Sequence, residues 1–448
     1  MLIRFTVSNF NSFLDEVELS MIPSKERAHP SQVYKTKQTN LVNILRGAII
    51  YGANASGKSN LVKAIEFARN LILRGKGPNK KFDLPLFKLC KQETNPSSRF
   101  EFEILVQGNI YAYGFELKNS YVESEWLFRL TKDKETLIFS RAHGTSNHDE
   151  FTFGKTLQEK STDEQSFLQF TSRGTRQNQL FLTESIERNI EDFSDVFNWF
   201  DRTLKVISPS TMHSGIEFKI SQDSTFKDYL QKVLHLADTG IDAIRTEQLD
   251  SIKSAGLPPQ ILDRLKEDLD NDEAALATDP DAGRRLVIKK QDGELVAFKL
   301  STTHKCQTQD LNVSFDLEEE SDGTRRLIEL TPSLYEMAYS KEPSVYIIDE
   351  IDRSLHPHIT RLLVREHLES EKNTQSQLIV TTHETSLLDV SLVRRDEIWF
   401  VQKSESGISS LYSLNNFQPR YDKDIRKDYL LGRYGAIPFV GDFKRLNR

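Results

Sequence analysis

A glycine-rich segment stands between the apolar run at 48–51 and an amphipathic stretch that begins near Leu61. It reads Gly52-Ala53-Asn54-Ala55-Ser56-Gly57-Lys58-Ser59-Asn60. Between a buried strand and a helix, such glycines let successive backbone N–H groups point into one concavity that suits polyphosphate oxygens. The helix start adds unpaired N–H groups, Lys58 offers a charge for the terminal phosphates, and Ser59 offers a hydroxyl ligand for Mg²⁺. The segment therefore predicts a nucleoside triphosphate site, with ATP and Mg²⁺ as cofactors.

Two further apolar runs end in polar residues that suit the same chemistry. The run at 344–348 ends in Asp349 and Glu350, and the run at 377–380 ends in hydroxyls and His383. Such runs are typical of buried parallel strands, and ligands bind at the carboxyl ends of these strands. Asp349 can hold Mg²⁺, Glu350 can accept a proton from the attacking water, and His383 can hydrogen-bond the γ-phosphate.

A helix start supplies the fourth signal. Ser321-Asp322-Gly323-Thr324 precedes leucine and isoleucine residues at helical spacing, and Ser321 is placed as the N-cap. Because a capped helix N-terminus is also an anion site, Ser321 and Gly323 are candidates to contact a triphosphate that another copy of the chain holds.

These segments, in this order, resemble the ABC-type ATPase heads of SMC proteins, RecF and the OLD-like defence ATPases of the AAA family. The matching positions are the Walker A box at 52–60, the signature at 321–324, the Walker B strand at 345–350, the D-loop at 352–357 and the switch histidine at 383. The resemblance implies an ATPase in which two heads sandwich two ATP molecules. Lys58 and Ser59 of one copy would bind each ATP, and the signature of the other copy would cap it.

Three other segments narrow the resemblance to the RloA/AbiL-type branch of abortive-infection and restriction-linked ATPases. They are the stretches at 5–13, 394–401 and 432–438. This likeness implies a homodimer or a higher even oligomer that controls a separately encoded effector protein, a nuclease, in bacterial anti-phage defence.

The chain departs from the family pattern in its signature, because Asp322 stands where the first of two glycines is usual. A carboxylate near a helix start is favourable for the helix dipole, but it repels an approaching phosphate unless it turns away. The Q-loop of the family also has no clear counterpart, and Gln177 and Gln179 are the candidates for it.

The Walker A and Walker B segments lie so far apart that much of the intervening chain must be an insertion. Strand-like alternation at 100–139 predicts an antiparallel sheet, and a charged pattern at 178–278 predicts short helices. We expect an α/β P-loop NTPase fold of the ABC ATPase head type, with a mixed or antiparallel lobe and an inserted helical lobe. The expected domains are 1–175 (Walker A and β lobe), 176–318 (helical lobe) and 319–448 (signature to switch histidine).

The composition is that of a large soluble chain with 448 residues and a net charge of −7. No apolar stretch approaches the ~18 residues that a membrane span needs, and the N-terminus lacks the apolar block of a signal peptide. Two cysteines, Cys90 and Cys306, are too few for a disulfide framework. We therefore expect a cytoplasmic protein with no membrane contact. The basic stretch at 74–81 predicts a solvated loop, with nucleic-acid contact kept as an alternative.

Two other functions stay open. A RecF- or SMC-like ATPase of DNA repair or chromosome maintenance would need a basic surface that faces DNA. A stand-alone OLD-like nuclease would use acids such as Asp268, Asp270 and Asp272 as metal ligands. The subunit of a membrane transporter is the least favoured class, because the Walker A box is SMC-like.

Overall fold

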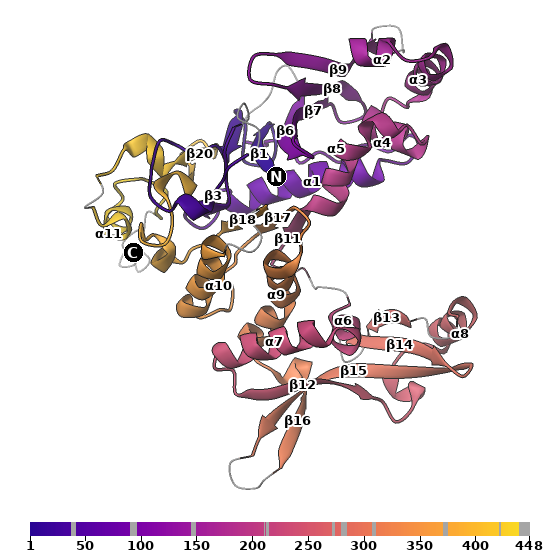
Figure 1. Cartoon of the computed structure of the whole chain (residues 1–448), viewed down its shortest axis with the longest axis vertical. Helices are drawn as coiled ribbons and strands as arrows, with labels where there is room; N and C mark the ends of the chain where they lie inside the picture. Colours follow the sequence, from indigo (N-terminus) through magenta and orange to yellow (C-terminus); the bar gives the residue numbers. More distant parts are fainter. Residues whose placement is uncertain are drawn as a thin grey trace, which may run out of the picture. The chain divides into compact units, whose positions relative to one another are not determined.

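The structure, a computed structural model, is an α/β protein that divides into two compact units (Figure 1). It describes residues 1–36, 42–89, 96–144, 149–209, 211, 215–270, 274–278, 285–306, 311–370, 375–420 and 423–438. Unit 1 comprises Met1–Pro209, Lys341–Ile351 and Val364–Arg448, and unit 2 comprises Ser210–Ser340 and Asp352–Leu363. The α/β fold class is confirmed, while the three-domain division stays a prediction.

A six-stranded sheet lies at the centre of unit 1, with the order β11-β17-β18-β5-β19-β20. All neighbours are parallel except β20, which is antiparallel to β19. Strands β5, β17 and β18 are buried along their whole length, as parallel strands covered on both faces should be. The bounds are β5 (Gly47–Tyr51), β11 (Leu204–Ile207), β17 (Ser344–Ile348), β18 (Ser376–Thr381), β19 (Ile398–Lys403) and β20 (Ser409–Ser413).

The helix α1 (Lys58–Arg74) follows β5 and the glycine-rich loop. Its residues Leu61, Ile65, Ala68 and Ile72 are buried, and their spacing places them on one face of the helix. Beside this face, Phe67 stacks on Phe100 with 5.5 Å between ring centroids. The helix therefore packs against a second sheet of unit 1.

This second sheet is antiparallel, with the order β10-β9-β8-β7-β6-β1-β2, and it confirms the strands expected at 100–139. One face carries buried aromatic side chains such as Phe5, Phe102 and Tyr113. The bounds are β1 (Leu2–Ser8), β2 (Val17–Ser20), β6 (Ser98–Val106), β7 (Asn109–Leu117), β8 (Val122–Leu130), β9 (Glu135–Ala142) and β10 (Glu150–Phe153).

Shorter elements complete unit 1. Helix α3 begins with a capping box between Ser161 and Glu164, which satisfies two backbone N–H groups. The other bounds are β3 (Val33–Tyr34), β4 (Ile44–Leu45), α2 (Lys155–Gln158), α3 (Thr162–Gly174), α4 (Phe181–Glu187), α5 (Ser194–Asn198) and α11 (Ile425–Leu430), while α10 (Pro357–Glu369) begins in unit 2 and ends in unit 1.

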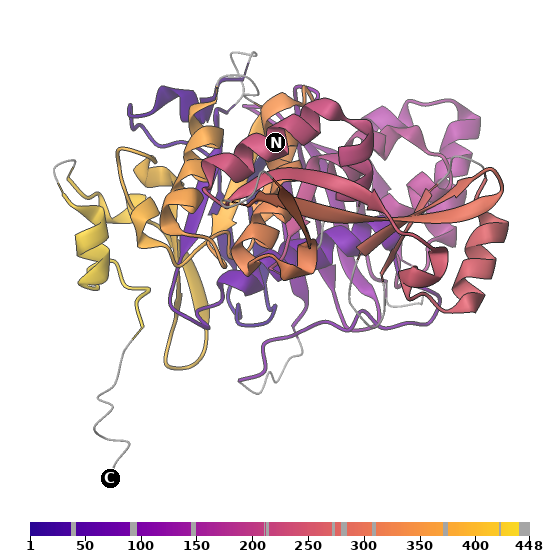
Figure 2. The same ribbon diagram turned by 90° about the horizontal axis from the view of Figure 1, so that it is seen from below.

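Unit 2 is built on an antiparallel sheet with the order β12-β15-β14-β13, to which β16 adds by pairing with β15. Figure 2 shows the long hairpin of β14 and β15. The bounds are α6 (Ile216–Gln222), α7 (Ser224–Leu236), β12 (Ile241–Gln248), α8 (Pro259–Asp268), β13 (Ala274–Thr278), β14 (Arg285–Gln291), β15 (Glu294–Lys305), β16 (Asn312–Asp316) and α9 (Asp322–Tyr339).

The helical pattern expected at 178–278 is wrong in part, because β11, β12 and β13 lie in this range beside the helices. β12 pairs with β15, whose residues 294–305 come later in the chain. A short polar segment becomes a strand here because it pairs with a strand far along the chain. The local sequence pattern of the segment does not reveal that partner.

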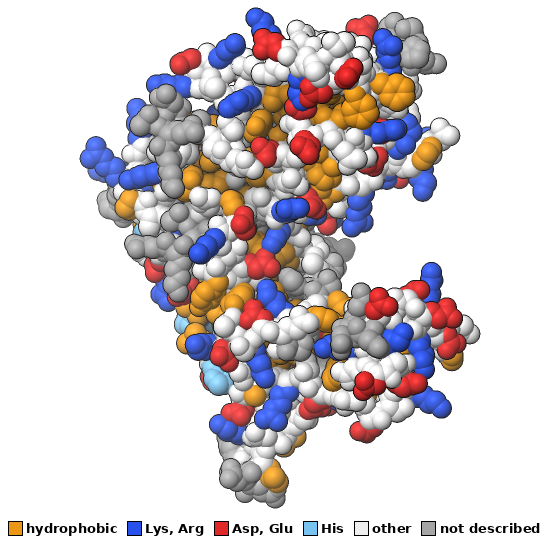
Figure 3. All heavy atoms as spheres, turned by 45° about the vertical axis from the view of Figure 1, so that its right-hand side comes forward, with side chains coloured by type: hydrophobic (Ala, Val, Ile, Leu, Met, Phe, Trp, Pro, Cys, Tyr) orange, Lys and Arg blue, Asp and Glu red, His pale blue; other side chains and the backbone are white. Residues whose placement is uncertain are grey.

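The surface is mixed in charge, and acidic, basic and hydrophobic side chains are interspersed on the face drawn in Figure 3. None of the helices in the described part of the chain combines the length and the apolar character that a bilayer-spanning segment needs. Cys306 forms no disulfide within the described residues, and Cys90 lies outside them.

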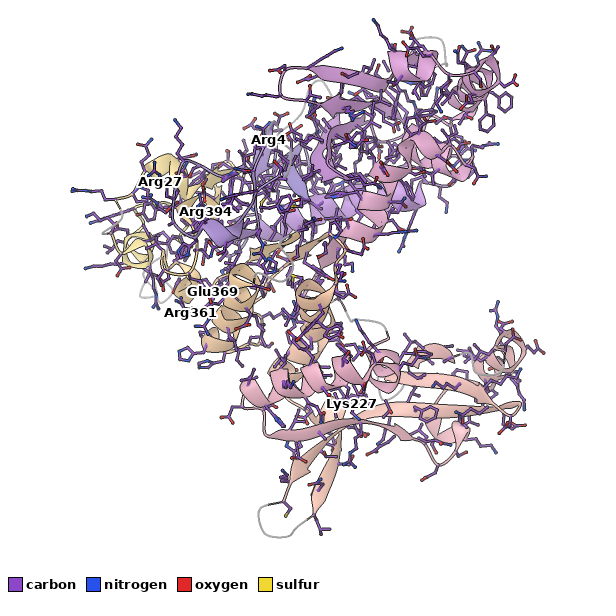
Figure 4. All side chains as sticks on the ribbon, in the orientation of Figure 1. Arg4, Arg27, Lys227, Arg361, Glu369 and Arg394 are labelled. Atoms are coloured by element: carbon purple, nitrogen blue, oxygen red, sulfur yellow. The ribbon has the colours of Figure 1, made fainter. Side chains whose placement is uncertain are left out.

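Buried charges gather where β5 and β19 begin. Arg394, labelled in Figure 4, donates two hydrogen bonds to the Asp396 carboxylate, at 2.9 and 2.7 Å. Arg46 donates to the carbonyl oxygens of His367 and Ser370, and the His367 ring contacts the Arg46 carbonyl oxygen at 3.2 Å. Burial raises the pKa of the Glu397 carboxyl well above its ordinary value. These groups therefore bond mostly to backbone and to one another, away from solvent.

His367 makes the stability of unit 1 sensitive to acid. Burial lowers the pKa of its imidazole to about 3, and the Arg46 guanidinium acts in the same direction. Below pH 6.5 the unfolded chain binds a proton at this position that the folded chain does not, so stability falls as the pH falls. From pH 6.5 to 5 we expect His367 to contribute a loss of about 2 kcal/mol.

Urea unfolding at both pH values measures this loss. His367→Gln should reduce the pH dependence, whereas His235→Gln, at an exposed histidine, should leave it unchanged. An equal pH dependence in wild type and His367→Gln would contradict the assignment.

Candidate functional site

The glycine-rich loop at 52–57 joins β5 to α1 and depends on its two terminal glycines. Gly57 has φ +118°, in the left-handed region, and a Cβ there would lie 2.6 Å from the Ser409 Oγ. A Cβ on Gly52 would lie 2.4 Å from the Val401 carbonyl oxygen. Because side chains at these positions would collide with β19 and β20, only glycine lets the loop curl this closely.

Two serines brace the loop from outside the expected motif. The Ser409 hydroxyl donates to the Ser56 carbonyl oxygen at 2.5 Å, and the Ser409 N–H donates to the Ser12 carbonyl oxygen at 2.8 Å. The Asn60 amide donates to the Ser12 hydroxyl at 2.8 Å. Ser12 lies in the stretch at 5–13, which sequence analysis named only for its resemblance to RloA/AbiL-type ATPases. No local sequence pattern predicted a role for Ser409.

The loop and the helix start fit a polyphosphate. The N-cap Gly57 has no side chain to cap the first N–H groups of α1, so this helix start suits an anion, although the Asn60 N–H donates to the Gly57 carbonyl oxygen at 3.0 Å. The Ser56 hydroxyl is buried and has no hydrogen-bond partner among the described residues. The donor set of amides, a hydroxyl and an ammonium is the one that phosphate oxygens require.

Lys58 and His383 meet at this loop. The Lys58 side chain is 5% exposed, and its Nζ lies 2.7 Å from the Gly52 carbonyl oxygen and 2.9 Å from the His383 Nε2. Because an ammonium only donates, the His383 Nε2 is the acceptor in this contact. The two side chains that sequence analysis assigned to the γ-phosphate therefore lie within hydrogen-bond distance of each other.

The acidic end of β17 is fixed by Thr381, at the end of β18. The Thr381 hydroxyl donates to the Asp349 carboxylate at 2.5 Å and accepts from the Glu350 N–H at 2.8 Å. Asp349 is 4% exposed, and Glu350 has φ +49°, a left-handed conformation that needs such support. Sequence analysis did not predict this role of Thr381. The hydroxyl groups at the end of the strand were the feature that could have indicated it.

Asp349 and Ser59 offer the hard oxygen ligands that Mg²⁺ prefers. Asp349 directly follows β17, and Ser59 lies in the first turn of α1, so both lie at the same edge of the sheet. The part of the chain that the structure describes, this site included, holds no group of three or more His, Cys, Asp or Glu side chains suited to a metal ion. Asp272, one acid of the nuclease alternative, lies outside the described residues.

The signature residues belong to unit 2, whereas the other expected site residues belong to unit 1. Ser321 is the N-cap of α9, and its hydroxyl accepts from the Thr324 N–H at 3.1 Å. Asp322 has a side chain that is 76% exposed and pairs with Arg325. The carboxylate that replaces the usual glycine is therefore directed to solvent and partly neutralised.

The close approach of the D-loop backbone requires a glycine at position 323. A Cβ at this position would lie 2.6 Å from the carbonyl oxygen of Ser354, which itself has φ +61°. The start of α9 and the D-loop backbone are therefore in direct contact within unit 2, and only glycine permits this approach.

Gln177 and Gln179, the candidates for the Q-loop, lie away from the phosphate loop. Their neighbours Arg176 and Asn178 donate to the carbonyl oxygens of Lys76 and Gly77, just past the C-terminal end of α1. The 17 residues of α1 span about 25 Å at 1.5 Å per residue. The two glutamines therefore lie at the end of the helix opposite the phosphate loop.

The parallel sheet, the loop before α1 and the acidic end of β17 define a P-loop ATPase-like domain of the AAA type. The family described as "AAA domain, putative AbiEii toxin, Type IV TA system" matches residues 48–389, and the chain belongs to this family. No curated protein matches the chain. Among solved structures, the SMC head domain from Thermotoga maritima is similar, with 12% identity and a TM-score of 0.36 over 92% of this chain and 98% of that chain.

Removing the Thr381 hydroxyl should destabilise unit 1 without leaving a cavity. Thr381→Val removes the hydroxyl that bonds the Asp349 carboxylate and the Glu350 N–H, and we expect a loss of about 1–3 kcal/mol in the free energy of unfolding. Urea denaturation measures this loss. The matched control is Thr136→Val, on the partly exposed strand β9, and equal effects of the two variants would contradict this role.

Proposed function

We propose that the chain is a Mg²⁺-dependent ATPase of the cytoplasm that dimerises around ATP and controls a separately encoded effector, a nuclease, in bacterial anti-phage defence. The observation that carries the ATPase assignment is the meeting of Lys58, His383 and the Asp349–Thr381 pair at one edge of the sheet. The loop 52–60 binds the phosphates through its amides and through Lys58.

The chemistry then follows from the positions of the remaining groups. Ser59 and Asp349 would hold Mg²⁺, which neutralises charge on the phosphates. Glu350 accepts a proton from the water that attacks the γ-phosphate, and His383 donates a hydrogen bond to that phosphate. When the γ-phosphate leaves, Lys58 and His383 lose their common partner, which links nucleotide state to the position of the histidine.

Dimerisation is proposed from the signature helix. In the proposed sandwich, Ser321 and Gly323 of one copy contact the ATP of its partner copy, using the N-terminus of α9 as an anion site. The outward direction of Asp322 and its pairing with Arg325 support this, because the carboxylate need not face the phosphate.

The defence role rests on the family. Its description names a putative toxin and a type IV toxin–antitoxin system, and such a system pairs two components. This supports the proposal that the chain acts together with a separately encoded protein, as the resemblance to RloA/AbiL-type ATPases also suggests.

Two outcomes would favour the other functions. Stimulation of ATP hydrolysis by DNA ends, without any phage component, would favour a repair or chromosome-maintenance ATPase. Metal-dependent nicking of DNA by the purified chain would favour a stand-alone nuclease. Co-purification with a nuclease encoded in the adjacent reading frame would support the proposed effector.

Two substitutions in the ATPase site should separate ATP binding from ATP hydrolysis. Lys58→Ala should weaken ATP affinity by about 10- to 100-fold, because it removes a charged donor to phosphate. Glu350→Gln should keep ATP affinity and lower the hydrolysis rate by about 100- to 10,000-fold, because the general base is lost. Calorimetry and phosphate release measure these effects. Lys63→Ala, on the exposed side of α1, is the control, and wild-type ATP affinity in Lys58→Ala would refute the site.

The sandwich predicts a nucleotide-dependent dimer. Glu350→Gln should dimerise in the presence of Mg·ATP, as measured by light scattering after size-exclusion chromatography. Adding Ser321→Asn should prevent this, because asparagine caps a helix as well as serine does but presents a larger side chain. Ser161→Asn makes the same change at the N-cap of α3 and should leave the dimer intact. A dimer that survives Ser321→Asn would exclude the signature from the interface.

A further inference from the structure

The outward face of the antiparallel sheet carries a trough that is separate from the ATPase site. It has a volume of about 310 Å³ and lies across β6, β7, β8 and β9. Its walls differ in character: Glu101 and Glu103 stand on the β6 side, and Trp126 and Phe128 stand on the β8 side. Nothing in the proposed ATPase cycle uses these residues.

Small residues on β7 create the floor of the trough. In the sheet register, Ala112 lies between Glu103 and Phe128, and Gly114 lies between Glu101 and Trp126. A Cβ on Gly114 would come within 2.4 Å of the indole ring, so the indole lies over the β7 backbone. The middle strand therefore leaves room between an acidic wall and an aromatic wall.

The acidic wall carries more negative charge than its arginines neutralise. Arg4 of β1, labelled in Figure 4, pairs with Glu18 and Glu103, the latter at 3.0 Å. Arg99 pairs with Glu16, Glu101 and Glu116. Glu135 lines the trough as well, so two arginines face six carboxylates. Burial raises the pKa of the Glu103 carboxyl, which Arg4 opposes and the nearby Glu101 and Glu18 reinforce.

The aromatic wall already accepts a cation. The Arg99 guanidinium carbon lies 4.7 Å from the centroid of the Trp126 ring, a cation–π contact. Trp126 and Phe128 are partly exposed, so their surfaces remain accessible from the trough. An aromatic wall opposite carboxylates is the environment that a guanidinium or ammonium group prefers.

We propose that this trough binds an arginine- or lysine-rich segment of another protein. One cationic side chain of that segment would lie between the carboxylates of Glu101 and Glu103 and the rings of Trp126 and Phe128. Charge complementarity selects this occupant, because six carboxylates repel a nucleic acid or an acidic peptide. The inference does not depend on ATP hydrolysis.

A labelled peptide of alternating glycine and arginine tests this with the full-length chain. Fluorescence anisotropy gives its affinity, and the intrinsic tryptophan signal locates it, because Trp199 and Trp399 are only 2% and 7% exposed. We expect the peptide to bind and to change the emission of Trp126. Glu101→Gln with Glu103→Gln should weaken binding by about tenfold or more, because two charge-assisted contacts are lost.

Matched variants keep the test decisive. Glu159→Gln with Glu267→Gln removes the same charge at exposed positions and should change the affinity by less than about twofold. Trp126→Phe keeps an aromatic ring over Gly114 and should bind the peptide without the change in emission. ATP hydrolysis should be unchanged in all these variants, which separates this site from the ATPase site.

Three outcomes would overturn the proposal. The first is peptide affinity that is unaffected by the Glu101 and Glu103 changes. The second is an equal loss in the control pair, which would indicate attraction by net charge alone. The third is displacement of the peptide by spermidine at equal concentration, which would indicate a polyamine site instead of a protein-binding site.

Discussion

The parallel pairing of β5, β17 and β18 is the constraint on which the candidate site depends. In this register Ile50 lies opposite Thr381, and Ile348 lies opposite Val380. A shift by one residue would move the end of one strand by about 3.3 Å relative to its neighbour and would separate the Thr381 hydroxyl from Asp349. The pairing thus brings the polar residues that follow each strand to one edge of the sheet, where the Thr381 hydroxyl fixes the positions of Asp349 and Glu350.

The two ends of the parallel strands in this sheet carry different kinds of polar groups. Where β5 and β19 begin, Arg46, Arg394 and Glu397 are buried in bonds to backbone and to neighbouring charges. At the opposite edge, Lys58 and His383 lie within hydrogen-bond distance of each other, in a contact that a phosphate group can replace. A fixed network at one end of the strands supports the positions of the reactive groups at the other end, as precise sites require.

Local sequence motifs predicted most of the site residues but few of the residues that hold them in position. The glycine-rich loop, the acidic strand end and the histidine were predicted because each is a short run of characteristic residues beside an apolar strand. Ser409 was not predicted, since its bond to Ser56 joins residues 353 positions apart. Gln177 and Gln179 were Q-loop candidates by residue type alone, and the bonds of their neighbours place them near the C-terminal end of α1. The strands of unit 2 were missed in part because their partners lie far along the chain.

The contact between Gly323 and the Ser354 carbonyl oxygen has a consequence for dissecting the molecule. Unit 2 is discontinuous, and its smaller piece, Asp352–Leu363, comes from beyond the Walker B strand. A fragment cut at 210 and 340 would contain the whole signature helix but not the backbone that its first turn touches. Residues 210–340 expressed alone therefore lack a contact of the signature helix that the intact chain has. A fragment of unit 2 should also include residues 352–363, joined to 210–340 as a fusion.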